Sequence, residues 1–90
     1  MNNGIKKKLE ELIGKEVNIY HPDYGIRFVY PYEGHSDSQK GEILRFEEDD
    51  CILVKSVQYR GINDIFSVLE MIIPIDSISN ISTRIDKEKG

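Results

Sequence analysis

Two short apolar runs separated by four consecutive acids occupy the middle of this chain, over residues 41–59. The first run covers residues 43–46 and the second covers residues 51–57. Each run is too short for a stable helix and has the length of a β-strand. Four adjacent acids repel one another and are costly to bury, so we expect the chain to reverse in solvent at Asp49 and Asp50. The pattern predicts a β-hairpin at the centre of the fold.

Four apolar residues recur at helical spacing near the N-terminus: Ile5, Leu9, Leu12 and Ile13. They fall at i, i+4, i+7 and i+8, which is one face of a helix. Gly14 follows at the position where a glycine commonly ends a helix. We therefore predict an amphipathic helix over residues 4–13. Because a helix of this length is marginal by itself, its apolar face is expected to lie against a sheet.

Alternating apolar and polar residues predict strands over residues 16–20 and 26–32, a nearly continuous apolar run predicts a strand over residues 65–73, and a last short strand is predicted over residues 78–82. Pro31 limits the second of these strands to a sheet edge or a strand end. The segment from Ile65 to Ile73 is apolar apart from Ser67 and Glu70, so we expect it to be buried over much of its length. Residues 33–40 form a polar loop, which we expect to be the most flexible segment within the domain.

The fold predicted by this order of elements is mostly β: a small β-barrel of five to six short antiparallel strands with an N-terminal α-helix. A barrel is favoured because open strand edges would aggregate. The chain has 90 residues, which suits one domain, here residues 1–82, followed by a flexible charged tail over residues 83–90.

Composition narrows the function classes. The net charge of −4 argues against a surface that grips duplex DNA broadly. There is one cysteine, no apolar run long enough to span a membrane and no secretory signal at the N-terminus, so we expect a cytoplasmic protein.

Several short segments resemble the Sm-like proteins, including the Hfq-like bacterial RNA chaperones. The matching segments are a V-x-I-Y strand at Val17–Tyr20, a glycine-led strand at Gly41–Glu47, an I-L-V-K strand at Ile52–Lys55 and an I-S-x-I ending at Ile78–Ile81. The resemblance implies a small Sm-like barrel, ring-shaped homo-oligomers and binding of single-stranded RNA. A generic small barrel of the SH3 or Tudor kind would give a similar pattern.

The chain departs from the Hfq-like pattern where those proteins carry a Tyr-Lys-His run that shapes a uridine pocket. The corresponding positions here are Pro74, Ile75 and Asp76. The Arg-Gly of other Sm families is also absent from the final segment, since Arg60-Gly61 lies too early. The resemblance therefore supports the barrel more strongly than it supports RNA binding.

Flat aromatic rings and basic side chains suggest contacts to single-stranded RNA or nucleotides, because rings stack on bases and cations hold phosphates. The candidate residues are Lys6, Lys7, Lys8, Tyr24, Arg27, Tyr30, Tyr32 and Lys40. The same tyrosines would suit a protein-interaction module with no role in nucleic-acid binding. They would also serve as ordinary core and strand-edge residues, and the lysines as a solvated helix face.

Other chemistry is weakly signalled. Two His-x-Asp pairs, His21/Asp23 and His35/Asp37, could approach one another as metal ligands, but such residues are common in turns. The four acids lack the spacing of a calcium loop. Cys51 is expected to be a buried core thiol. With no phosphate loop or hydrolase motif, we predict a non-enzymatic protein without metal or cofactor.

Overall fold

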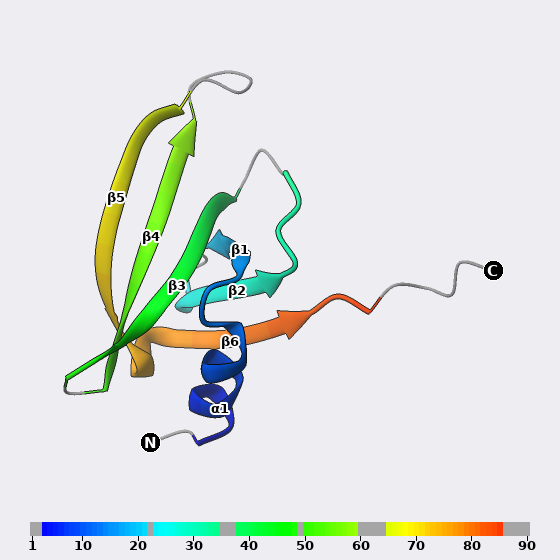
Figure 1. Ribbon diagram of the computed structural model, residues 1–90. Helices are drawn as coiled ribbons and strands as arrows, with labels where there is room; N and C mark the ends of the chain where they lie inside the picture. Colours follow the sequence, from blue (N-terminus) through cyan, green and yellow to red (C-terminus); the bar gives the residue numbers. More distant parts are fainter. Residues whose placement is uncertain (1–2, 22, 35–37, 49, 60–64, 86–90) are drawn as a thin grey trace.

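The computed structural model describes residues 3–21, 23–34, 38–48, 50–59 and 65–85 (Figure 1). The elements are α1 (Asn3–Leu12), β1 (Glu16–Tyr20), β2 (Ile26–Tyr30), β3 (Gln39–Glu47), β4 (Cys51–Tyr59), β5 (Ile65–Pro74), the 3₁₀-helix η1 (Ile75–Ser77) and β6 (Ile78–Thr83). The mostly β composition and the N-terminal helix are confirmed. The central hairpin is also confirmed, since β3 and β4 pair antiparallel. Asp50, in the turn between them, has a left-handed backbone conformation with φ 59°.

The six strands form one sheet in the order β5-β4-β3-β1-β2-β6. The expectation of a purely antiparallel sheet was wrong, because β6 runs parallel to β2 while the other neighbours are antiparallel. The sheet is also open: within the described residues β5 and β6 are its two edges and do not pair with each other. The chain passes from the β5 edge to the β6 edge through η1, and β6 then pairs with β2.

The sheet is nevertheless strongly curled. Pro74 ends one edge strand and Ile78 begins the other, four residues later. Four extended residues reach at most about 14 Å, whereas six strands laid flat would place the edges about 24 Å apart. The edges therefore approach each other at this end, and Figure 1 shows the chain turning at the lower end of β5 into β6.

Two features of β3 produce the bend. The β3–β4 register shifts between Ile43 and Arg45, so that Leu44 is an extra residue of a bulge. Gly41 lies where β1 crosses closely, and a Cβ atom there would lie 2.2 Å from Cδ1 of Ile19. Only a glycine leaves room for the Ile19 side chain at this crossing.

The core lies inside the curl and is closed by α1. Leu9 and Leu12 of the helix are buried together with side chains of the strands and η1: Val17, Ile19, Phe28, Ile43, Ile52, Val54, Ile73, Ile75 and Ile78. The helix ends at Leu12, and Gly14, which has φ 84°, donates a backbone hydrogen bond of 2.7 Å to the Ile43 carbonyl. The predicted helix is thus shifted by one residue, and Ile13 instead makes a β-bridge to Ile43.

Two burial predictions were wrong. The strand β5 was expected to be largely buried, yet Val68 and Ile72 are 52% and 65% exposed, because side chains alternate along the strand and these two lie on the face opposite the core, whereas the neighbouring Ile73 is buried. Cys51 was expected in the core but is half-buried, because it starts β4 directly after the solvent-facing turn. The prediction for Pro31 was correct, since β2 ends at Tyr30.

Candidate functional site

Among the described residues, the most exposed aromatic side chain lies where the chain turns from β1 to β2. Tyr24 in this turn is 89% exposed. Beside the turn, the guanidinium of Arg27 lies over the ring of Tyr20, 4.6 Å from its centre, and the two residues face each other in the β1–β2 register. A flat guanidinium and exposed rings of this kind can stack on planar ligands. We call Tyr20, Tyr24 and Arg27 the turn patch.

A second aromatic and basic pair lies farther along the sheet. The Lys40 ammonium is 5.5 Å from the centre of the Tyr32 ring and 3.3 Å from a carboxylate oxygen of Glu16. Burial lowers the pKa of Lys40, but the hydrogen bond and charge of Glu16, together with the nearby Tyr59 and Tyr32, outweigh burial and raise that pKa above 10.5. Lys40 is therefore held as a fixed cation.

Lys40 belongs to a hollow of about 140 Å³ on the sheet face opposite the core. Its lining residues are Glu16, Lys40, Gly41, Glu42, Lys55 and Val57. They come from β1, β3 and β4, and the lysine and glutamate side chains make two ion pairs, Lys40–Glu16 and Lys55–Glu42, the second at 3.8 Å. We call this site the outer hollow.

The three lysines of α1 do not form an unopposed basic patch. Lys6 lies 3.6 Å from a carboxylate oxygen of Asp50, and Lys8 lies 3.5 Å from Glu11. Lys7 is exposed. Acidic partners reduce the attraction of Lys6 and Lys8 for phosphates.

The remaining predicted aromatic residue, Tyr30, is half-buried against the core, with the Lys15 ammonium 5.7 Å from its ring centre. The predicted site residues are thus divided among α1, the turn patch, the core edge at Tyr30 and the outer hollow.

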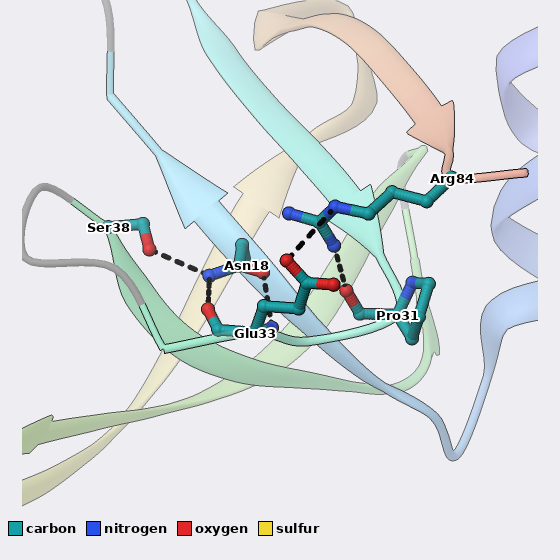
Figure 2. Close-up of polar contacts among 5 residues, drawn as sticks. All are labelled: Asn18, Pro31, Glu33, Ser38 and Arg84. Atoms are coloured by element: carbon teal, nitrogen blue, oxygen red, sulfur yellow. Dashed lines mark hydrogen bonds and ion pairs between the residues drawn. The ribbon is translucent and has the colours of Figure 1, made fainter. Parts of the chain in front are cut away.

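Figure 2 shows a polar cluster that the sequence did not single out. Asn18 of β1 is completely buried, and its amide nitrogen donates to the Glu33 carbonyl at 2.5 Å and to the Ser38 hydroxyl at 2.7 Å. Its amide oxygen accepts from the Glu33 backbone N–H at 2.8 Å. Asn18 therefore ties both described ends of the polar loop, predicted to be flexible, to the sheet. The signal available in the sequence was an asparagine between two apolar strand positions.

Arg84 holds the same loop from the other side (Figure 2). Its backbone N–H donates to the Tyr30 carbonyl at 2.7 Å, its guanidinium donates to the Pro31 carbonyl, and its Nε lies 3.5 Å from a Glu33 carboxylate oxygen. Arg84 was predicted to belong to the charged tail, of which residues 86–90 lie outside the described part of the chain.

Exposed apolar side chains gather along the free edge of β5. Val68, Leu69 and Ile72 are 52%, 41% and 65% exposed. Because side chains alternate along a strand, Leu69 lies on one face of the sheet while Val68 and Ile72 lie on the other. In Figure 1 β5 runs along the outside of β4, with no strand on its far side.

The metal hypothesis gains no support from the described residues. His21 and Asp23 are exposed, and His35 and Asp37 lie outside the described residues. Among the residues that the structure describes, no three His, Cys, Asp or Glu side chains are grouped as metal ligands would be. In the acidic turn, Glu47 pairs with Arg45 at 3.0 Å.

Comparison with known proteins leaves the site unassigned. No protein-family model, no curated protein and no solved structure matches the chain. In the described residues, no helix has the length and apolar character needed to cross a membrane.

Proposed function

We propose that this chain is a non-enzymatic, Sm-like small-barrel protein that assembles with copies of itself through the edges of its sheet. The observation that carries the proposal is the β5 edge, which combines an unpaired row of backbone groups with exposed apolar side chains. Natural edge strands are normally short, charged or covered. β5 has ten residues and carries one charge, Glu70, in its length.

A second copy is the occupant that suits this edge best. Apolar side chains are exposed on both faces of β5, so a partner must continue the sheet and also cover its faces. A second copy of a curled sheet supplies both, and it offers either of two edges for pairing: its own β5 or the polar edge of β6. Pairing β5 with β5 gives a closed dimer, whereas pairing β5 with β6 propagates around a ring.

The proposal includes membership of the Sm-like small-barrel family. Its support is the order of the elements, with an N-terminal helix closing the core, a long strand bent at Gly41 and Leu44, and a 3₁₀ turn that links the two edges. The open β5 and β6 edges are the surfaces through which such units would assemble.

Changing Ile72 to lysine is expected to convert the assembly into a monomer, because a charged side chain on the edge strand would have to be buried against the neighbouring copy. Size-exclusion chromatography with light scattering measures the mass. Ile85→Lys is the matched control, since Ile85 is 87% exposed and lies beyond the end of β6. A monomeric unmodified protein, or loss of assembly in both variants, would contradict the proposal.

Single-stranded RNA or nucleotide binding is the second candidate, favoured by the turn patch. Tyr24 is almost fully exposed, and the Arg27 guanidinium lies over the Tyr20 ring, 4.6 Å from its centre. Base stacking on such groups tolerates any sequence, and its phosphate contacts weaken as salt rises. Because the chain has five tyrosines and no tryptophan, co-purified nucleic acid would be visible as excess ultraviolet absorbance in the same chromatography.

The RNA candidate predicts that Tyr24→Ala and Arg27→Ala each weaken binding to a single-stranded oligonucleotide by about fivefold to a hundredfold, the range expected for loss of one stacked base. Fluorescence anisotropy at two salt concentrations measures the affinity. Arg45→Ala is the control, because Arg45 is an exposed arginine that pairs with Glu47 at the acidic turn. Equal weakening by Arg45→Ala, or no binding by the unmodified protein at low salt, would contradict RNA binding by the turn patch. Self-assembly would then be the remaining proposed function.

A further inference from the structure

The outer hollow presents its charges in a defined order. Glu16 of β1 lies directly opposite Glu42 of β3, so two carboxylates are neighbours. Lys40 lies opposite Val57, and Lys55 is two residues from Val57 on the same strand. The two lysines are therefore diagonal neighbours, about 7–8 Å apart at their Cα atoms. The hollow has an acidic side formed by two carboxylates and a basic side formed by two ammonium groups.

The arrangement discriminates by charge distribution and not by net charge. The four side chains sum to zero, so a ligand with one charge gains attraction from one side of the hollow and suffers repulsion from the other. A ligand with both charges close together interacts favourably with both sides. The existing ion pairs, at 3.3 and 3.8 Å, keep the four side chains oriented toward one another across the hollow.

Size restricts the ligand further. Liquid water occupies about 30 Å³ per molecule, so the hollow has room for about five non-hydrogen atoms of that size. A small α-amino acid is close to this number, and its ammonium and carboxylate groups are attached to one carbon. The apolar side chain of Val57 provides a contact for a short aliphatic side chain.

We propose that the outer hollow binds a small neutral α-amino acid in its zwitterionic form. The ligand ammonium lies between Glu16 and Glu42, and the carboxylate bridges Lys40 and Lys55. The Lys40 ammonium is also in contact with the Tyr32 ring, 5.5 Å from its centre. The site is separate from the turn patch, and it lies one strand from the β5 edge, since its Val57 and Lys55 are the register partners of Val68 and Glu70.

The test compares L-alanine with two analogues of the same size, L-alaninamide, which lacks the negative charge, and L-lactate, in which a hydroxyl replaces the positively charged ammonium group. Backbone amide shifts of Gly41 and Val57 report binding in the unmodified protein by nuclear magnetic resonance. We expect saturable shifts with L-alanine in the millimolar range and at least about tenfold weaker binding of each analogue, since each loses charged hydrogen bonds. Equal binding of either analogue, or no saturable shift with L-alanine, would overturn the proposal.

Substitutions then assign the two sides of the hollow. Glu42→Gln and Lys55→Gln are each expected to weaken L-alanine binding by about tenfold or more. Glu70→Gln is the matched control, because Glu70 lies opposite Lys55 on β5 but does not line the hollow. Weakening by Glu70→Gln equal to that by Glu42→Gln would show a general charge effect and would also refute the site.

Discussion

Replacing Asn18 by alanine is expected to lower the free energy of unfolding by about 3 kcal/mol. The substitution removes all three hydrogen bonds of a completely buried amide. The backbone N–H and carbonyl of Glu33 lose their hydrogen bonds to the Asn18 side chain. Each polar group whose lost hydrogen bond is not replaced lowers the free energy of unfolding by about 1–3 kcal/mol. Urea denaturation followed by circular dichroism measures the change.

Asn80→Ala is the control for this prediction. Asn80 is an exposed asparagine of β6 whose side-chain oxygen accepts a hydrogen bond from the nearby Ser82 hydroxyl. A surface change of this kind is expected to alter stability by no more than about 0.5 kcal/mol. Hydrogen exchange at the Glu33 amide provides a local readout, since this proton should exchange faster in Asn18→Ala. Comparable stability of the two variants would mean that Asn18 does not anchor the loop.

The second large effect is expected at Gly41. Gly41→Ala should destabilise the protein by about 1–3 kcal/mol, the usual cost of adding a methyl group to a filled core. The added Cβ would lie 2.2 Å from Cδ1 and 2.8 Å from Cγ1 of Ile19, which is itself fully buried and has little space to move. Gly34→Ala is the matched control, because the nearest atom to a Cβ there is 3.8 Å away.

A double-mutant cycle tests the stated cause. Ile19→Val removes one methyl group near Gly41 and is expected to cost about 0.5–1.5 kcal/mol by itself. In combination with Gly41→Ala, it should cost less than the sum of the two single changes, because the space it vacates receives the new methyl group. Strict additivity in denaturation experiments would show that the Ile19 contact is not the reason for a glycine at this position.

The Asn18 and Gly41 predictions both concern strand β1, which carries Asn18 and the adjacent Ile19. Ile19 points into the core and Asn18 points to the opposite face, so adjacent residues fix the curl of the sheet and the position of the polar loop. The outer hollow lies on the same face as Asn18, since Lys40 is its cross-strand partner. A loosened loop in Asn18→Ala would therefore disturb the hollow more than the distant β5 edge.

The sequence by itself determined the elements. Strand-length apolar runs, the acidic reversal at Asp50 and the helical spacing that ends at Gly14 are local signals, because each depends on neighbours within a few residues. For the same reason Pro31 indicated either a sheet edge or a strand end, and the structure shows the second, since β2 ends at Tyr30. The sequence identified the tyrosines and basic residues as candidate ligand-binding residues. It did not show which of them lie next to one another in the folded protein.

Tertiary structure decided how these elements are arranged and which residues meet. The parallel pairing of β6 with β2 and the open edge of β5 depend on contacts between segments far apart in the chain, which periodicity does not encode. An apolar run such as β5 looks the same in sequence whether a neighbouring strand covers it or not. Glu16, Lys40 and Lys55 form one hollow because the strand register makes them neighbours across the sheet, and register is a property of the folded chain.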